Sequence, residues 1–164
     1  MIYATPTDLV ARFGETEIVN LTDAENIPPS VINVARLEVK LSDAQSFVDG
    51  YVGQVYRLPL TGCVKFGTGG TVEHVPPPVL TRLTCDLARY YLYDDLAPEN
   101  EVYRRYQAAV KELEAIALGK AQLACPWGGS PGQSLVADAQ AGDDVQTYSS
   151  FRRGITDDDL QGFA

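Results

Sequence analysis

The chain has 164 residues, of which 45% are apolar, and this is enough for one globular domain with an appendage. Its net charge is −9, and the residues up to 120 and those beyond are both acidic, which argues against binding to a nucleic-acid backbone. The apolar runs are too short for a membrane span, and the first residues lack the features of a signal peptide, so we expect a cytosolic protein.

The first predicted helix begins in the sequence TPTD at residues 5–8. Thr5 suits the N-cap, Pro6 suits the first helical position, and Asp8 is favourable in the first turn. This helix should end at Gly14, and a second short helical turn is expected over residues 15–21.

The next predicted helix begins near Pro29 and Ser30 and ends at Gly50–Gly53, a length of about six turns. Its apolar residues recur at intervals of three and four, which indicates one buried stripe. The core residues expected from this helix are Val34, Leu37, Leu41 and Val48.

Residues 57–78 interrupt the helical pattern with glycines and prolines. The segments CVKF and TVEHV flank GTGG, which predicts a small hairpin, with a mobile loop as the alternative. His74, the only histidine, has no second histidine or cysteine nearby, and we expect it to be a loop residue.

The stretch VPPPVLTRLTCDLARYYLYDDL at residues 75–96 is apolar or aromatic on nearly every side. Such a broad apolar surface is typical of a central helix with neighbours on several sides. Arg82, Asp86 and Arg89 form its one polar strip. The core residues expected here are Leu80, Leu83, Leu87 and Tyr91.

The last predicted helix covers residues 99–118 and ends at Gly119, a residue type common just after a helix. Glu101 and Arg105 are spaced to form an ion pair. The core residues expected from this helix are Val102, Tyr106 and Leu113.

After Lys120 the sequence has no helical period and is rich in Gly, Ser, Ala and Asp. We therefore expect an all-α fold, a small bundle of about four helices in residues 1–120, with a long loop or hairpin between helices. Residues 121–164 should form an extended C-terminal arm with a possible short terminal turn near Thr156. The arm could be a docking peptide that orders on binding or a floppy tail.

Catalytic and metal-binding patterns are weak. GGSPG at 128–132 matches a hydrolase nucleophile motif, but Pro131 lacks the N–H that would stabilise an oxyanion. The three cysteines suggest neither a zinc site nor a disulfide framework, and Cys85 is expected to be a buried apolar residue. We expect no catalytic residue, no metal and no cofactor.

Acidic residues gather near the predicted inter-helix loop, at Asp94, Asp95, Glu99 and Glu101. These carboxylates could bind a divalent cation, but they lack the spacing of a calcium loop. Helix capping and solubility account for them better.

Tyrosines crowd the ends of three predicted helices in numbers that exceed what a core of this size needs. Tyrosine is favoured at protein interfaces because it is amphipathic. We therefore expect a subunit or partner interface formed by Tyr51, Tyr56, Tyr90, Tyr93 and Tyr103, together with four residues of the arm: Trp127, Phe151, Leu160 and Phe163.

Several segments together resemble the head–tail connector (neck or adaptor) family of Mu-like phages and prophages. They cover residues 1–120 and the closing SSFRRGITDDDLQGF, and include YATPTDLVARFGE, DAQSFVDGYVGQVYRLPL, VPPPVLTRLTCDLARYYLYD and EVYRRYQAAVKELEAIALGK. The resemblance implies a structural virion protein that forms a ring of about a dozen subunits. It also implies a portal protein and tail proteins as partners, and a channel through which DNA passes.

The resemblance places the protein in the neck of the virion, after assembly in the host cytoplasm, and it carries no active site. The acidic balance would suit a channel for DNA, because an acidic wall lets DNA slide. Two alternative functions rest on features other than this resemblance. One is a small metal-dependent enzyme that uses the four carboxylates, and the other is a regulatory binding module that uses its C-terminal tail as a peptide ligand.

Overall fold

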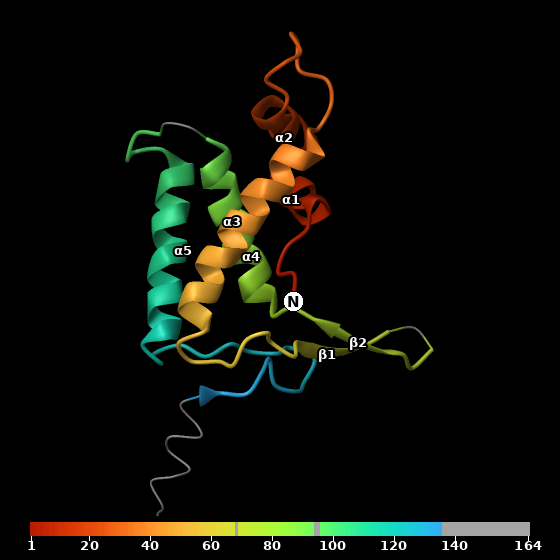
Figure 1. Ribbon diagram of the computed structural model, residues 1–164, viewed down its shortest axis with the longest axis vertical. Helices are drawn as coiled ribbons and strands as arrows, with labels where there is room; N and C mark the ends of the chain where they lie inside the picture. The colour runs from red at the N-terminus through yellow and green to blue at the C-terminus, as the bar shows by residue number, and fades with distance from the viewer. Residues whose placement is uncertain (68, 94–95, 136–164) are drawn as a thin grey trace, which may run out of the picture.

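Five helices and one two-stranded hairpin form the part of the chain that the computed structural model describes, residues 1–135 without 68 and 94–95 (Figure 1). The helical character of the predicted all-α bundle is confirmed, with five helices in the described part where about four were expected, and the connection between α3 and α4 is the hairpin and not a loop alone. None of the helices in this part is long and apolar enough to cross a bilayer. In chain order the elements are α1 (Pro6–Phe13), α2 (Glu15–Thr22), α3 (Val34–Val52), β1 (Cys63–Phe66), β2 (Val72–Val75), α4 (Pro78–Leu92) and α5 (Glu101–Ala117).

The start of α1 follows the sequence prediction. Thr5 and Asp8 form a capping box, in which the Asp8 carboxylate accepts the Thr5 N–H at 2.8 Å and the Thr5 hydroxyl accepts the Asp8 N–H. Gly14 ends the helix with a φ of 89°, a backbone conformation that is unfavourable for residues with a side chain. The short turn expected after it is the separate helix α2.

Helix α3 begins later than predicted. The Asn33 side chain accepts the Arg36 N–H at 3.1 Å and caps the helix, while residues 29–32 remain in the preceding loop. Val34 therefore lies in the first turn and is 49% exposed, so its prediction as a core residue is wrong. The other three core residues expected from this helix, Leu37, Leu41 and Val48, are buried.

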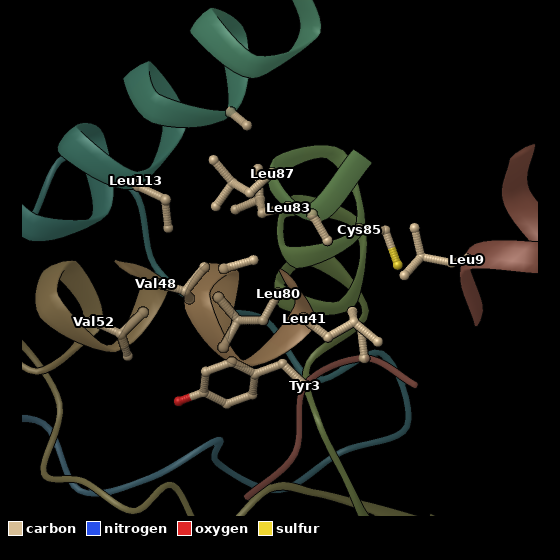
Figure 2. Close-up of a cluster of buried hydrophobic side chains, with 14 of the residues drawn as sticks. Tyr3, Leu9, Leu41, Val48, Val52, Leu80, Leu83, Cys85, Leu87 and Leu113 are labelled. Carbon is tan, nitrogen blue, oxygen red and sulfur yellow. The ribbon is translucent and has the colours of Figure 1, made fainter. Parts of the chain in front are cut away.

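Helix α4 is central, as predicted, and contacts α1, α3 and α5. In Figure 2, Leu83 and Leu87 face Leu113 of α5, while Cys85 points towards Leu9 of α1. Leu80, Leu83, Leu87 and Cys85 have no exposed surface, and Tyr91 packs partly buried against this core. The apolar residues around most of the circumference of α4 are thus explained, because this helix has neighbours on three sides.

Helix α5 closes the bundle against α3 and α4. Val102 and Leu113 are buried and Tyr106 is partly buried against the core, as predicted. The expected ion pair is present, with 2.8 Å between the Arg105 guanidinium and the Glu101 carboxylate. The Asn100 side chain accepts the Val102 N–H and caps the helix.

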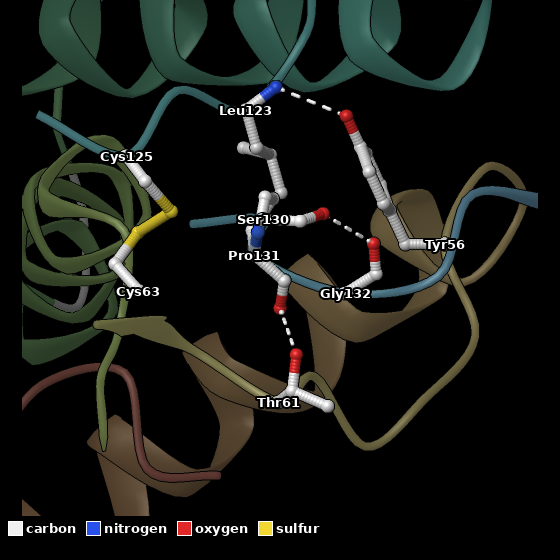
Figure 3. The surroundings of a disulfide bond; sticks show 8 residues. All are labelled: Tyr56, Thr61, Cys63, Leu123, Cys125, Ser130, Pro131 and Gly132. Carbon is white, nitrogen blue, oxygen red and sulfur yellow. Dashed lines mark hydrogen bonds between the residues drawn. A yellow bond between two sulfur atoms is a disulfide. The ribbon is translucent and has the colours of Figure 1, made fainter. Parts of the chain in front are cut away.

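Residues 121–135, the first part of the predicted arm, are attached to the loop before the hairpin (Figure 3). A disulfide joins Cys63 to Cys125 with a Cα–Cα distance of 5.2 Å, so the expectation that no disulfide is formed is wrong. The Tyr56 hydroxyl accepts the Leu123 N–H at 3.1 Å, and the Pro131 carbonyl accepts bonds from Thr61 and Gly62. Residues 136–164 lie outside the described part.

Candidate functional site

A cluster of four tyrosines lies where the end of α4 meets the beginning of α5. Tyr90 and Tyr106 stack with 4.0 Å between ring centroids and 20° between planes. Tyr103 meets Tyr90 edge-on at 6.0 Å, and Tyr91 lies 6.3 Å from Tyr106. Tyr103 and Tyr106 share a face because they are three residues apart on a helix. All four rings remain partly exposed.

The cluster borders a groove of about 660 Å³ between α3 and the end of α4. We call it the aromatic groove, and it is lined by Lys40, Asp43, Ser46, Phe47, Tyr90, Tyr91 and Tyr93. Lys40, Asp43 and Ser46 follow one another at three-residue intervals, and Phe47 lies four residues after Asp43, so the α3 residues follow one helical face. Phe47 extends the aromatic surface to Tyr51, whose ring centroid lies 5.2 Å away.

Burial disfavours ionisation of two tyrosines of the groove and of one in the cluster beside it. Burial raises the pKa of Tyr91 to about 12, with smaller contributions from Tyr106 and Asp43. Burial also raises the pKa of Tyr93 and of Tyr106. The groove therefore offers neutral rings with hydroxyl groups, a surface suited to contact with protein.

Tyr93 is held in place by an ionic cluster that ties α4 to the N-terminal helices. The Arg89 guanidinium donates to both carboxylate oxygens of Glu17, at 2.6 and 2.9 Å, and stacks 4.5 Å from the centre of the Phe13 ring. The Tyr93 hydroxyl donates to the same carboxylate at 3.2 Å. Within the predicted polar strip of α4, Arg82 lies 3.8 Å from Asp86, whereas Arg89 forms its ion pair with Glu17.

The predicted interface residues divide into four sets. Tyr90, Tyr93 and Tyr103 lie at the aromatic groove or in the tyrosine cluster beside it, and Tyr51 packs partly buried near Phe47. Tyr56 is only 6% exposed, so its prediction as an interface residue is wrong, because the 121–135 segment covers it. Trp127 is 44% exposed beneath Lys65. Phe151, Leu160 and Phe163 lie outside the described residues.

The sequence reasoning missed the α3 side of the groove. Lys40, Asp43 and Phe47 lie off the apolar stripe that was used to predict the core. Phe47 at four residues before Tyr51 was the signal that could have indicated a second aromatic face on α3.

The GGSPG motif has a structural place in the 121–135 segment. The Ser130 hydroxyl donates to the Gly132 carbonyl at 2.8 Å (Figure 3). His74, expected in a loop, instead lies exposed on β2, where it pairs with Val64.

The described residues contain no group of three or more His, Cys, Asp or Glu side chains placed to bind a metal ion. Asp94 and Asp95, two of the four carboxylates considered for a cation, lie outside them.

The fold defines a mainly helical protein with a hairpin between its third and fourth helices. The family model described as Bacteriophage Mu, Gp36 matches residues 3–138. The chain is 32% identical over 123 residues to Gene product J of Escherichia phage Mu, which covers 73% of this chain and 74% of that protein. It is 29% identical over 126 residues to the Mu-like prophage FluMu protein gp36 of Haemophilus influenzae, covering 75% and 76%.

The chain therefore belongs to the phage Mu Gp36 family, and it is a phage protein. This agrees with the resemblance to proteins of Mu-like phages and prophages at the level of the family.

Proposed function

We propose that this phage protein is a structural component of the virion, a head–tail connector whose copies assemble into a ring of about a dozen subunits. The ring would join the portal of the capsid to tail proteins in the neck of the particle and leave a channel for DNA. In this proposal the protein acts through its surfaces, without catalysis and without a cofactor.

The aromatic groove is the observation that carries this proposal. It presents neutral, amphipathic rings on the outside of a domain whose core is already complete. Exposed aromatic surface of this kind is typical of protein interfaces. The net charge of −9 adds support, because an acidic channel wall would repel the DNA backbone and allow it to slide.

Negative-stain electron microscopy of the purified chain, alone and mixed with its portal protein, tests the proposal. Rings in either sample are expected, and their rotational symmetry would give the number of subunits. Only small particles in both samples would contradict the ring and favour the regulatory binding module.

Two matched variants connect the assembly to the groove. Ser46→Arg places a long cation in the groove, whereas Ala108→Arg places one on the exposed surface of α5 outside it. We expect Ser46→Arg to lose rings while Ala108→Arg keeps them, with both variants retaining the helical circular-dichroism spectrum. Rings from Ser46→Arg would show that the groove is not part of the assembly.

A further inference from the structure

The tip of the hairpin presents an apolar pair that no other described residue covers. Phe66 is 69% exposed and Val72 is 54% exposed, and the two are paired directly across β1 and β2. Directly opposed residues of an antiparallel pair place their side chains on the same face. Both strand edges are unpaired among the described residues, and a two-stranded hairpin alone is only marginally stable in water.

The tip cannot reach the aromatic groove of its own subunit. The hairpin leads through residues 76 and 77 into the beginning of α4, whereas Tyr90, Tyr91 and Tyr93 lie at the other end of this helix. The 15 residues of α4 span about 22 Å. Strands of four residues extend only about 13 Å, and Figure 1 shows them projecting away from the helices.

The two surfaces are chemically complementary. The groove offers the rings of Phe47, Tyr90 and Tyr91 to the apolar pair at the tip. Its rim carries Lys40 and Asp43. Glu73 and Lys65 are paired across the hairpin next to the tip pair and lie on its opposite face, because side chains alternate along a strand. Lys65 lies over the Trp127 ring of its own subunit, so Glu73 is the charge available to this rim. Lys40, Asp43 and Glu73 form no ion pair with described residues of their own subunit.

We propose that the hairpin tip of one subunit inserts into the aromatic groove of the next, with Phe66 and Val72 against the tyrosine rings and Glu73, on the opposite face of the hairpin, directed to Lys40. This inference rests on the proposed ring and names its subunit contact. The contact joins two different surfaces, so each subunit uses its hairpin on one side and its groove on the other. Contacts of this heterologous type close into a ring when the rotation between subunits permits.

Cysteine cross-linking tests the pairing. Phe66→Cys and Asp43→Cys are purified separately, mixed under assembly conditions and treated with a short bismaleimide. Cys85 is fully buried and the other two cysteines form the disulfide, so the new thiols are the accessible ones in the described part. A covalent dimer is expected in the mixture and not in either variant alone.

Phe66→Cys that cross-links to itself would overturn the proposal in favour of a two-fold contact. Rings that form without any cross-link between positions 66 and 43 would overturn this contact and leave the connector function standing. If the unmodified chain assembles neither alone nor with portal, both the contact and the proposed function fail.

A second pair of variants tests whether the hairpin tip contributes to the affinity between subunits. Phe66→Ser with Val72→Ser removes the apolar pair, and Ile27→Ser with Val31→Ser removes two exposed aliphatic side chains from the loop before α3. We expect the first variant to weaken self-association at least about tenfold in analytical ultracentrifugation, and the control to leave it unchanged. Equal effects of the two pairs would contradict a specific role for the tip.

Discussion

Asp23 organises the loop between α2 and α3 with a single carboxylate. It accepts the N–H groups of Ser30 and Val31 at 2.9 and 3.1 Å and the side-chain amide of Asn26. These hydrogen bonds, led by that from Ser30, lower the pKa of Asp23 from 3.8 to about 2. The carboxylate thus substitutes for secondary structure in a segment that contains two prolines.

Replacing Asp23 with Ala should release this loop. A carboxyl group whose pKa is lowered by folding stabilises the fold above its ordinary pKa, and the contribution is lost as the pH falls towards the lowered value. The difference in melting temperature between wild type and Asp23→Ala should therefore be full above about pH 4 and shrink towards pH 2. Faster amide exchange at Ser30 and Val31 should accompany it, and a pH-independent difference would contradict this role.

Substitutions of Leu87 test whether the middle of α4 forms the centre of the core. Leu87→Asp should prevent cooperative folding because it buries an unpaired charge, and Leu87→Ala should lower the free energy of unfolding by about 2–5 kcal/mol. Leu118→Asp is the matched control, because Leu118 is 69% exposed just after α5. Thermal melts followed by circular dichroism measure all three, and a normal melt from Leu87→Asp would contradict the central position of this residue.

Individual burial could be predicted where a residue lies in the middle of a strongly periodic helix. Leu37, Leu83 and Leu113 illustrate this, because their neighbours at three- and four-residue spacing fix the buried face. Val34 and Tyr56 could not be predicted in this way. The exposure of Val34 depends on which of two possible residues starts the helix. The burial of Tyr56 depends on a contact with Leu123, which lies 67 residues later in the chain.

At the scale of elements, the attachment of residues 121–135 combines one covalent bond with hydrogen bonds and packing. The disulfide spans 62 residues, and Leu123 contributes a side chain that is 6% exposed. Arg57 and Leu135 add backbone bonds between the same two stretches. The bundle and this segment should therefore respond together when the disulfide is removed.

Changing Cys63 and Cys125 to Ser should lower the free energy of unfolding by about 4 kcal/mol, since a cross-link over a loop of this length restricts the unfolded chain. Denaturant titrations of the wild type with and without dithiothreitol, and of the double variant, measure the effect. Reductant should lower the midpoint of the wild type and leave that of the double variant unchanged. Equal midpoints for all three would mean that the bond is not formed.

The helices and the hairpin could be predicted because their signals are local: the Thr5 cap, the glycines at 67, 69 and 70, and Gly119. The disulfide could not be predicted, because two cysteines 62 residues apart carry no local signature of proximity. The sequence predicted a tyrosine-rich interface and no groove, and that interface stays a prediction. The tyrosine excess indicated a surface, but its α3 side required knowledge of how α3 and α4 pack.

At the scale of the whole molecule, charge opposes assembly. Each subunit carries a net charge of −9, so neighbouring subunits repel each other at low ionic strength. Added salt screens this repulsion over a Debye length of about 10 Å at 0.1 M. Contacts between neutral aromatic and apolar surfaces are affected far less.

Self-association should therefore strengthen as sodium chloride is raised from about 0.02 to 0.5 M. Sedimentation velocity at a fixed protein concentration measures the shift from small to large species. Weakening with salt would show that ion pairs, and not the aromatic groove and the hairpin tip, dominate the subunit contact.

The attachment of residues 121–135 also sets an order of events during synthesis. The bonds from Leu123 to Tyr56 and from Thr61 to Pro131 join residues 67 and 70 positions apart, and contacts that close such long loops form after local ones. We therefore expect the helices to pack before residues 121–135 attach. Packing of α4 against α1 would then enclose Cys85, the thiol nearest to Cys63 in sequence, before Cys125 reaches Cys63.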